Sequence, residues 1–427
     1  MIQNQILPGV YINVVAGPRG EDVLGARGIV TVPLALDWGG TITELAQGES
    51  PFVKLGYPIT APEMVLMREL QNYATKTIIY RLNGGDKAQA ELSTGVIARA
   101  IYPGTRGNSL SVTVTADGSV FVVKTYVGTL EVDTQVVPTP KDFVANNFVE
   151  IEAEENAVFT AATVPLAGGT SGAPGETAYD EYLAALELFK YNVICYTGTD
   201  SGVKAKIIAF IKRMRDDEGV RVQAVMSGAT ANYEGIINHT IGGISYGNAL
   251  TAAQACATRA GIEAMLGTAA SGTNLELVGW TDVNPRLNRI QLETRTKNGE
   301  SLFVIKDGKV KLLYDINSLT TFTEEKPKDF CKNLVIRTLD AYVMDLQSLL
   351  DTRAIGKLRN NANGRNQLKG MIVDMTKNRY LATESIEDFE ADDVAVEIGT
   401  ERDSVVAHSA IKVVDTVDKI YLTVVSR

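Results

Sequence analysis

Few side chains in this sequence could act as catalytic bases, because its 427 residues include only two histidines. A Ser-His-Asp mechanism needs a histidine beside an exposed serine. His408 precedes Ser409 in an alternating run, so the two side chains should point to opposite faces of a strand. His239 has no nucleophile-elbow pattern near it. We therefore expect both histidines to be structural, and the sequence predicts no catalytic residue.

Metal and phosphate chemistry also lack their usual patterns. Three cysteines are scattered along the chain, at Cys195, Cys256 and Cys331, and together with two histidines they do not match the spacing of a zinc site. An odd number of unpaired cysteines fits a reducing compartment better than a disulfide scaffold. Neither Gly168-Gly169 nor Gly242-Gly243 is followed by Lys-Ser or Lys-Thr, so no phosphate-binding loop is predicted. The sequence predicts neither a metal site nor a cofactor site.

The overall charge disfavours nucleic acid and anionic membranes as partners. The formal net charge is −10, from 41 Lys and Arg against 51 Asp and Glu, so the surface should repel phosphate groups. A basic stretch between residues 353 and 379 is nevertheless followed by an acidic stretch between 384 and 403. These stretches could match an oppositely charged neighbour and set its register, or form a solvated surface with intramolecular ion pairs. The basic side chains are Arg353, Lys357, Arg359, Arg365, Lys369, Lys377 and Arg379.

The composition is that of a soluble globular protein, with 45% hydrophobic and 22% charged residues. A chain of 427 residues is long for one core, so two to four domains are expected. No window approaches the roughly 18 apolar residues of a membrane span. The first eight residues lack the basic start and apolar stretch of a signal peptide. We therefore expect a soluble protein that is made in the cytoplasm.

The first 90 residues divide into an arm and the start of an α/β core. Residues 1–27 carry a short β-prone run at 10–15, which is either an extended arm or an ordinary first strand. Residues 28–90 then show a strand at 28–34, a helix opened by a capping box at Thr60-Ala61-Pro62-Glu63, and a strand at 76–82.

Residues 91–170 contain strands only, which predicts an antiparallel sandwich or barrel inserted into the α/β core. Two runs, at 110–115 and 120–126, flank Ala116-Asp117-Gly118-Ser119, whose Asp-Gly pair is typical of a tight hairpin turn. Further strand runs are predicted at 129–137, 148–152 and 157–160. The glycine-rich exit at 166–175 predicts a flexible boundary.

The α/β pattern returns in residues 175–325. Strands at 192–196 and 220–226 enclose a helix whose apolar residues run from 203 to 214, and this β-α-β order favours a parallel sheet. Asn284-Pro285 should start another helix. Asp307-Gly308 should turn a hairpin.

The last domain, residues 326–427, should begin with a helix near Pro327 and continue with a second helix after a turn at Gly364. Its final residues read as a hairpin of two β-branched strands, at 411–414 and 420–425. A terminal strand leaves unpaired N–H and C=O groups unless something pairs with it. Either its own domain or another subunit must therefore supply a strand that pairs with it.

Several short motifs, spread over nearly the whole chain, occur in a recognisable order. The motifs are Pro8-Gly9-Val10-Tyr11-Ile12, Gly104-Thr105-Arg106-Gly107-Asn108, residues 166–170 leading into Tyr179, Asp315-Ile316-Asn317-Ser318-Leu319-Thr320-Thr321-Phe322-Thr323, Lys326-Pro327-Lys328-Asp329-Phe330-Cys331-Lys332-Asn333, Val335-Ile336-Arg337, Asn363-Gly364-Arg365 and Asp418-Lys419-Ile420-Tyr421-Leu422-Thr423-Val424. Together they resemble the tail sheath proteins of contractile phages and of phage-tail-like bacteriocin particles.

The resemblance implies an α+β multidomain fold. Its central α/β domain would be subtilisin-like but non-catalytic, with the inserted β-sandwich or barrel and an α+β C-terminal domain whose terminal strands are exchangeable. It also implies a structural subunit whose hexameric rings stack around an inner tail tube and contract by rigid-body rearrangement. The implied partners are copies of the chain itself, the inner tail tube protein, and the baseplate and tail terminator proteins. Made in the bacterial cytoplasm, the subunit would join a virion or phage-tail-like particle.

The resemblance also implies where subunits meet, through strands donated by the two ends of the chain. Residues 405, 406 and 411–414 would belong to the receiving sheet. The expected strand-pairing residues are Val10, Tyr11, Ile12, Val14, Ile411, Val413, Ile420, Tyr421, Leu422 and Val424. The candidates for facing the tube are Lys357, Arg359, Arg365 and Lys369. The alternative is a soluble α/β enzyme, a hydrolase or a nucleotide-binding protein, whose last strand pairs within its own domain.

Overall fold

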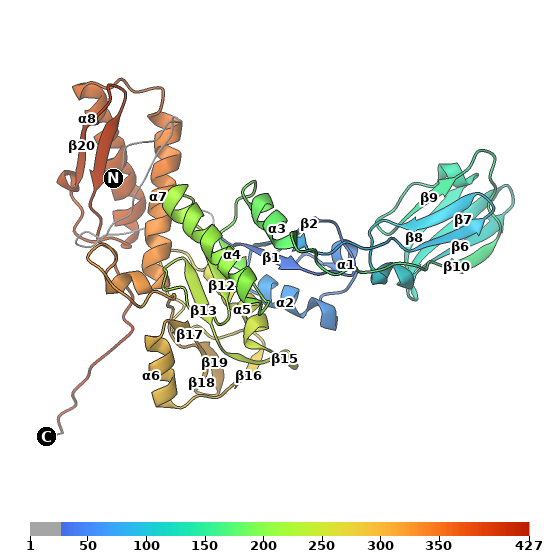
Figure 1. Cartoon of the computed structure of the whole chain (residues 1–427), viewed down its shortest axis with the longest axis horizontal. Helices are drawn as coiled ribbons and strands as arrows, with labels where there is room; N and C mark the ends of the chain where they lie inside the picture. Colours follow the sequence, from blue (N-terminus) through green and yellow to red (C-terminus); the bar gives the residue numbers. More distant parts are fainter. Residues whose placement is uncertain (1–26, 427) are drawn as a thin grey trace. The chain divides into compact units, whose positions relative to one another are not determined.

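The computed structural model describes residues 27–426, and these fold into two compact units. Among the described residues, unit 1 contains residues 27–30, 72–75 and 190–426, while unit 2 contains residues 31–71 and 76–189. Helices and several separate sheets occur in both units, as predicted for a multidomain α+β protein (Figure 1). The predicted strand at residues 10–15, with Val10, Tyr11, Ile12 and Val14, lies outside the described residues.

A parallel sheet forms the centre of unit 1. Its strands follow the order β17-β13-β12-β11, and each neighbouring pair runs parallel. The bounds are Val193–Cys195 for β11, Gln223–Met226 for β12, Ile236–His239 for β13 and Glu300–Ser301 for β17. Helix α4 (Ser201–Lys212) connects β11 to β12, which confirms the predicted β-α-β unit. Asp200 begins this helix by accepting a hydrogen bond from the backbone N–H of Val203.

Helix α5 (Ala252–Met265) packs against this parallel sheet and is buried on nearly every side. It begins with a capping box formed by Thr251 and Gln254. Most of its buried residues are small, so the helix can approach the strands closely. The sequence did not predict this helix, because a helix that is buried all round lacks the one-sided apolar stripe of a surface helix.

Two smaller sheets complete the central part of unit 1. Strand β14 (Gly242–Ser245) pairs with β15 (Asn248–Leu250) and β16 (Trp280–Asn284), and β18 (Phe303–Lys306) pairs with β19 (Lys309–Leu312). Asp307 and Gly308 turn the second hairpin with φ angles of 55° and 75°, which confirms the predicted turn. Helix α6 (Arg289–Lys297) starts after Asn288 and not at Pro285, because the side chains of Asn288 and Gln291 form its capping box.

The last part of unit 1 consists of α7 (Asn333–Arg353), α8 (Ala362–Met375) and a hairpin of β20 (Val394–Ile398) and β21 (Val405–Ser409). Buried side chains of the two helices and β20 share one hydrophobic core. Gly364 does not form the predicted turn before the second helix, since it lies in the first turn of α8, which Asn361 caps. A Cβ at Gly364 would lie 1.9 Å from the carbonyl oxygen of Arg359, so this close approach requires glycine.

Unit 2 contains a group of three neighbouring strands with its helices, which we call the base. Its strands β1 (Ile29–Leu34), β3 (Lys76–Arg81) and β2 (Ile42–Ala46) lie in that order, and its helices are α1 (Phe52–Leu55), α2 (Val65–Gln71) and α3 (Ala178–Leu186). The predicted inner face is confirmed, because Met67 and Leu70 of α2 and Met64 in the 3₁₀ turn before it are buried. The predicted capping box is wrong, since Ala61 precedes the first turn and makes no side-chain cap.

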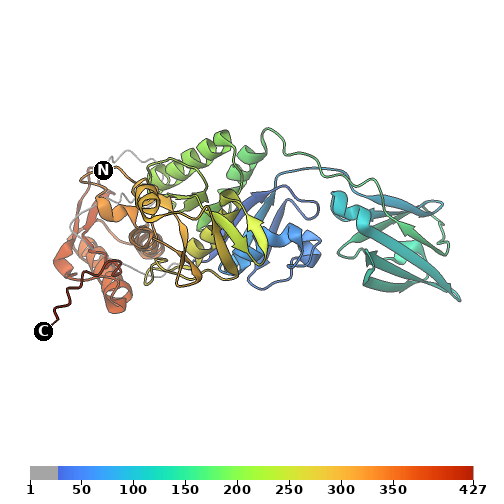
Figure 2. The same cartoon turned by 90° about the horizontal axis from the view of Figure 1, so that it is seen from below.

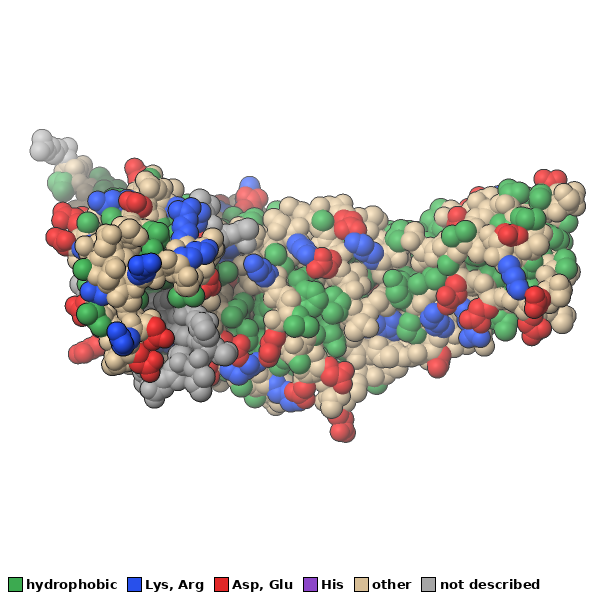
Figure 3. Space-filling view, turned by 90° about the horizontal axis from the view of Figure 1, so that it is seen from above, with side chains coloured by type: hydrophobic (Ala, Val, Ile, Leu, Met, Phe, Trp, Pro, Cys, Tyr) green, Lys and Arg blue, Asp and Glu red, His purple; other side chains and the backbone are tan. Residues whose placement is uncertain are grey.

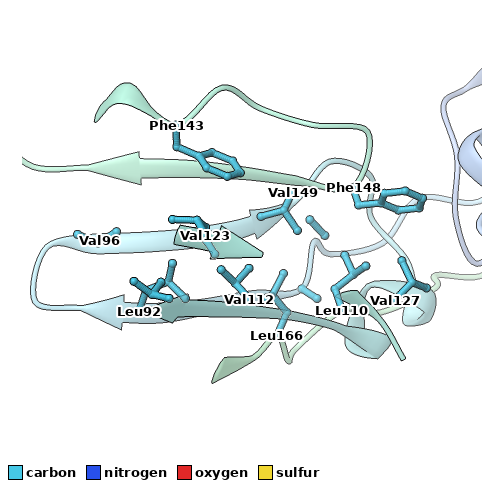
Figure 4. Close-up of a cluster of buried hydrophobic side chains, with 14 of the residues drawn as sticks. Leu92, Val96, Leu110, Val112, Val123, Val127, Phe143, Phe148, Val149 and Leu166 are labelled. Carbon is cyan, nitrogen blue, oxygen red and sulfur yellow. The ribbon is translucent and has the colours of Figure 1, made fainter. Parts of the chain in front are cut away.

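Two antiparallel sheets form the β-sandwich of unit 2. One sheet contains β4 (Gln89–Ser93), β5 (Val96–Ala100) and β9 (Val149–Ala153), and the other has the order β10 (Ala162–Pro165), β6 (Leu110–Asp117), β7 (Val120–Val127) and β8 (Leu130–Val137). Apolar side chains of both sheets meet in one core, including Leu110 and Val112 from one and Val96 and Val149 from the other (Figure 4).

The strand order corrects one detail of the predicted sandwich. The run at 157–160 is not a strand, and β10 takes its place, with Thr163 opposite Thr113 of β6. The hydroxyl oxygens of these two threonines lie 3.0 Å apart, which stabilises this pairing. Strands β4 and β5 were not predicted.

Two segments, residues 82–89 and 166–175, connect the sandwich to the base, and we call them the neck (Figure 2). Asp86 and Thr170 exchange backbone hydrogen bonds of 3.2 and 3.1 Å, and Gln89 and Ala167 do so at 2.9 and 3.1 Å. A Cβ at Gly85 would lie 1.9 Å from the carbonyl oxygen of Thr170, so the two backbones touch. The prediction of a flexible boundary at 166–175 is therefore wrong for most of this segment, because backbone hydrogen bonds and bridges fix it at several points between residues 166 and 174.

Candidate assembly surface

Helix α7 is attached to the centre of unit 1 through a buried cluster of four charged side chains, which we call the ionic hub. Arg259 and Glu263 come from α5, Asp315 follows β19, and Arg337 comes from α7. Arg337 donates hydrogen bonds to Glu263 at 2.8 Å and to Asp315 at 2.9 Å. Arg259 donates to the same two carboxylates at 3.0 and 2.6 Å. A further guanidinium, that of Arg27, lies 3.8 Å from the Glu263 carboxylate with its side chain only 10% exposed, so each buried carboxylate has more than one cationic partner.

The two arginines of the hub favour the charged form of Asp315. Burial alone would raise the pKa of the Asp315 carboxyl, yet the guanidinium groups of Arg337 and Arg259 outweigh this effect and hold that pKa well below its usual range. Asp315 also accepts hydrogen bonds from the backbone N–H of Gly272 and the side chain of Asn333, both at 2.9 Å. The Asp315 carboxyl is therefore held in its charged form.

A second buried ion pair holds α7 one turn further along. Arg215 follows α4, and its guanidinium donates two hydrogen bonds to the Asp340 carboxylate, at 2.7 and 2.8 Å. Because Arg337 and Asp340 are three residues apart, they lie on the same face of α7. Two buried contacts therefore fix the first half of α7 to the centre of unit 1.

The chain after β21 returns along the body of unit 1. The side chain of Ile411 packs against the core of α7 and α8, and Val413 forms a bridge with Ile386. Lys412 forms ion pairs with Glu387 and Asp388. Residues 411–413 are thus held by their own molecule.

Residues 420–425, by contrast, leave the body of unit 1 (Figure 1). Tyr421 is 92% exposed, and every other large hydrophobic side chain in this segment is at least 77% exposed. Within residues 27–426, no strand or bridge includes any residue of 419–426. The predicted hairpin of 411–414 with 420–425 is therefore wrong, because the chain continues outward after Asp418 instead of turning back. The residues concerned include Ile420, Tyr421, Leu422 and Val424.

The hairpin of β20 and β21 is a two-stranded sheet, so each of its strands has one edge without a strand partner among the described residues. Ile398 and Val405 face each other at its tip and are 65% and 37% exposed. An apolar pair at an open strand edge is a surface to which another strand can add. Val405, predicted to belong to a receiving sheet, lies in β21, while Ile411 and Val413 follow this hairpin outside it.

The four basic residues predicted to face a tube lie near the α7–α8 connection and on α8. Lys357 and Arg359 are exposed, whereas Arg365 and Lys369 are half-buried. Arg365 donates to the side chain of Asn360 at 3.1 Å, and Lys369 lies 3.5 Å from the carboxylate of Asp392. Lys and Arg side chains gather on this end of unit 1, interspersed with acidic ones (Figure 3). The two exposed residues are thus the better placed of the four to meet another protein.

The two histidines lie in different environments. His239 is fully buried, its Nε2 lies 2.6 Å from the carbonyl oxygen of Ile241, and its ring packs on Phe303. Burial lowers the pKa of His239 to about 3, so the ring is neutral at neutral pH. His408 is exposed on β21. Between residues 27 and 426, no group of three or more His, Cys, Asp or Glu side chains is arranged to hold a metal ion.

None of the helices in the described part of the chain combines the length and the apolar character needed to cross a membrane.

The sequence did not assign a role to any residue of the ionic hub. Asp315, Asn333 and Arg337 belong to motifs singled out for their resemblance, but the hub forms only when α5 and α7 meet. One signal was available, because Arg259 and Glu263 are separated by four residues within an otherwise apolar, alanine-rich segment. Such a pair in a helix without a polar face indicates buried ion pairs.

Comparison with known protein families gives matches along nearly the whole described chain. Residues 172–318 match the phage tail sheath protein central domain, residues 325–427 the phage tail sheath C-terminal domain, and residues 83–171 the phage tail sheath protein beta-sandwich domain. Residues 27–82 match the N-terminal region of domain III of the tail sheath protein Gp18. These are families of structural sheath proteins and not of enzymes.

Individual proteins match over nearly their full length. The phage-like element PBSX protein XkdK of Bacillus subtilis is 33% identical over 97% of this chain and 96% of its own. The crystal structure of a sheath tail protein from Desulfitobacterium hafniense is 36% identical, with a TM-score of 0.81, and the match covers 91% of this chain and 93% of that one. The contracted helical sheath of the anti-feeding prophage shares the fold alone, at 11% identity and a TM-score of 0.57 over 99% of both chains.

Proposed function

The chain belongs to the phage tail sheath family, and from this premise we propose that it forms hexameric rings that stack around an inner tail tube. In this proposal the rings twist and spread as the sheath contracts, and the tube is driven through the target envelope. The subunit joins a virion or a phage-tail-like particle after synthesis in the bacterial cytoplasm. Its partners are further copies of itself, the inner tail tube protein, and the baseplate and tail terminator proteins.

The observation that carries this proposal is the apolar segment at residues 420–425, which its own molecule leaves exposed. Exposed β-branched and aromatic side chains in a row are costly in water, and an extended backbone without partners can add to a sheet edge. We propose that this segment, with Ile420, Tyr421, Leu422 and Val424, pairs with the β20–β21 hairpin of a neighbouring subunit. Each backbone hydrogen bond of such a pairing contributes about 0.5 to 1.5 kcal/mol, so a six-residue strand makes a firm joint.

The amino-terminal run with Val10, Tyr11, Ile12 and Val14 is proposed as the second donated strand. It precedes the described residues, so its support is its β-prone sequence alone. Two donated strands for each subunit would connect every copy to more than one neighbour. A network of this kind can stay connected while the bodies of its subunits rotate.

The buried ion pairs of α7 support movement of rigid bodies during contraction. Breaking a buried charge pair without replacing its partner costs several kcal/mol, so the ionic hub resists separation of α7 from the centre of unit 1. In this proposal contraction changes the contacts between subunits and leaves those of the hub intact. The energy comes from new interfaces, a few kcal/mol for each subunit, multiplied over many copies.

Two finer features belong to the same proposal. The α/β core is proposed to be a non-catalytic relative of the subtilisin-like fold, which its parallel sheet and flanking helices support. The basic side chains near the α7–α8 connection are proposed to face the tube, with Lys357 and Arg359 foremost because they are exposed. Arg365 and Lys369 would then support this surface from the side. An acidic tube surface would be the complementary partner.

The test of strand donation is a variant that lacks residues 420–427. We expect the purified variant to remain folded, because these residues make no strand contact within the described chain, and to lose assembly into cylinders in electron micrographs. The matched control is Val158→Ser, which removes a side chain that is 63% exposed in the β-sandwich. Normal cylinders from the truncated protein would exclude strand donation by this end of the chain.

A further inference from the structure

Lys332 lies at the start of α7 and holds two aspartates of the C-terminal segment. Its Nζ lies 2.5 Å from the Asp415 carboxylate and also pairs with Asp418. The ammonium group lies 5.3 Å from the centre of the Tyr314 ring. The side chains of Lys332 and Asp418 are only 16% and 8% exposed, so the contact is largely shielded from water. We call Lys332, Asp415 and Asp418 the ionic clip.

The clip favours the charged form of the lysine. Partial burial alone would lower the pKa of Lys332, yet its hydrogen bonds to Asp415 and Asp418 outweigh this effect and raise it. A shielded ammonium with two carboxylate partners is a stronger contact than an exposed ion pair. The clip can therefore hold the backbone of residues 415–418 in one place.

Lys332, the basic residue of the clip, is itself held in place by backbone contacts. The backbone of Lys332 bridges to Ile316, and its N–H donates to the carbonyl oxygen of Asp329 at 3.0 Å. The next residue, Asn333, donates both its backbone N–H and its side-chain N–H to Asp315 of the ionic hub. The clip is thus joined to the most deeply buried charges of unit 1 through two adjacent residues.

We infer that Lys332 is the positioning residue for the donated strand, fixing where and in which direction residues 420–425 leave the subunit. The inference rests on the proposed strand donation. Asp418 is the last residue that the clip holds, and the exposed segment begins directly after it. Residues 415–418, which we call the root of the donated strand, are therefore attached to the start of α7, next to the ionic hub, and not to the β20–β21 hairpin (Figure 1).

This attachment has a consequence for assembly. A strand with a fixed root has fewer conformations to lose when it pairs with a neighbour, so the clip lowers the entropic cost of association. Releasing the root would leave the six pairing residues unchanged and would weaken assembly all the same. Because the root of the donated strand is attached to the start of α7, it moves together with α7. A rotation of the centre of unit 1 is therefore passed directly to the neighbouring subunit.

The test compares Lys332→Met with Lys412→Met in the full-length chain. Both variants remove a lysine that pairs with two acidic residues near the C-terminal segment, but the partners of Lys412, Glu387 and Asp388, are 51% and 71% exposed. Hydrogen exchange of the backbone amides at 414–418 is measured in the unassembled subunit. Assembly is then measured as the lowest protein concentration that yields sedimenting cylinders.

We expect Lys332→Met to speed exchange at 414–418 by about tenfold or more and to raise the concentration needed for assembly by a similar factor, since charged hydrogen bonds are lost. Lys412→Met should change both values less than twofold. An Asp415→Asn and Asp418→Asn double variant should behave like Lys332→Met, and it keeps the inference testable should Lys332→Met fail to fold.

Three outcomes overturn the inference. Unchanged exchange in Lys332→Met would show that the clip does not hold the segment. Faster exchange with unchanged assembly would show that the fixed root does not matter. Equal effects of the two lysine variants would show that no special role belongs to Lys332. In each case strand donation itself still stands as long as deletion of residues 420–427 abolishes assembly, so the two failures are distinguishable.

Discussion

Arg337 on α7 and Glu263 on α5 form an ion pair with 2.8 Å between Nη1 and Oε1, and neither side chain exposes any surface to solvent. The two residues are 74 positions apart in the sequence. The pair therefore joins two parts of unit 1 that fold from distant segments. Charges in such a site are retained only when every partner is in place.

Replacing Arg337 with Met should lower the free energy of unfolding of unit 1 by about 3 to 5 kcal/mol, because Glu263 and Asp315 would keep buried charges with too few partners. The chain contains two tryptophans, and Trp280 lies in unit 1. Urea unfolding followed by Trp280 fluorescence in a Trp38→Phe background measures the change. Arg289→Met is the control, since this side chain is 91% exposed and its variant should unfold like the parent. A loss below about 1 kcal/mol for Arg337→Met would contradict the importance of the hub.

Acidification should destabilise unit 1 through His239. The folded-state pKa of about 3 lies below the ordinary value of 6.5, so the unfolded chain binds more protons between these values. Stability that is fully present above pH 6.5 is then lost as the pH falls towards 3, by about 1.4 kcal/mol for each pH unit.

His239→Gln should therefore flatten the decline in stability between pH 6.5 and 5, measured by the same Trp280 unfolding assay. The control is His408→Gln, which removes the other, exposed imidazole and should retain the decline. The same decline in His239→Gln as in the parent would show that another group is responsible.

The neck between base and sandwich should depend on Gly85 and not on Gly84. A Cβ at Gly85, where φ is +144°, would lie 1.9 Å from the Thr170 carbonyl oxygen, whereas a Cβ at Gly84 meets nothing within 4 Å. Gly85→Ala should destabilise unit 2 by about 2 to 3 kcal/mol, because backbone cannot yield as a flexible side chain can. Trp38 fluorescence in a Trp280→Phe background measures this change. Equal stabilities for Gly84→Ala and Gly85→Ala would mean that the neck is not closely packed.

The sequence correctly predicted those turns, strands and helices whose characteristic residues are close neighbours in the chain. The hairpin around Gly118, the turn at Asp307-Gly308 and the β-α-β unit around α4 are confirmed for this reason, although the first turn consists of Gly118 and Ser119 because Asp117 pairs with Val120. Helix α5 was missed because alanine-rich burial on all sides gives no periodic stripe.

The candidate site was predictable only in part, because its contacts join distant segments. The apolar character of residues 420–425 is visible in the sequence, and it led to the prediction of a terminal strand. The pairing of Lys332 with Asp415 and Asp418 is not visible, since 83 residues or more separate the partners and only the fold brings them together.

Reversing the exposed basic charges near the α7–α8 connection should weaken attachment to the tube and leave the subunit folded. Lys357→Glu with Arg359→Glu should reduce co-sedimentation with assembled tube protein, and the loss should be larger at low than at high salt. Lys377→Glu with Arg379→Glu changes the net charge by the same amount within the same basic stretch and serves as the control. Equal binding by both double variants would contradict a tube-facing role for Lys357 and Arg359.

The most direct measurement is a high-resolution electron cryomicroscopy map of the cylinders that this chain forms. Our account predicts that residues 420–425 form a strand hydrogen-bonded to the β20–β21 hairpin of a neighbouring copy. It also predicts that Lys332 still holds Asp415 and Asp418 just before that strand. A map in which residues 420–425 fold back on their own subunit, or lie free while the cylinder is intact, would contradict it.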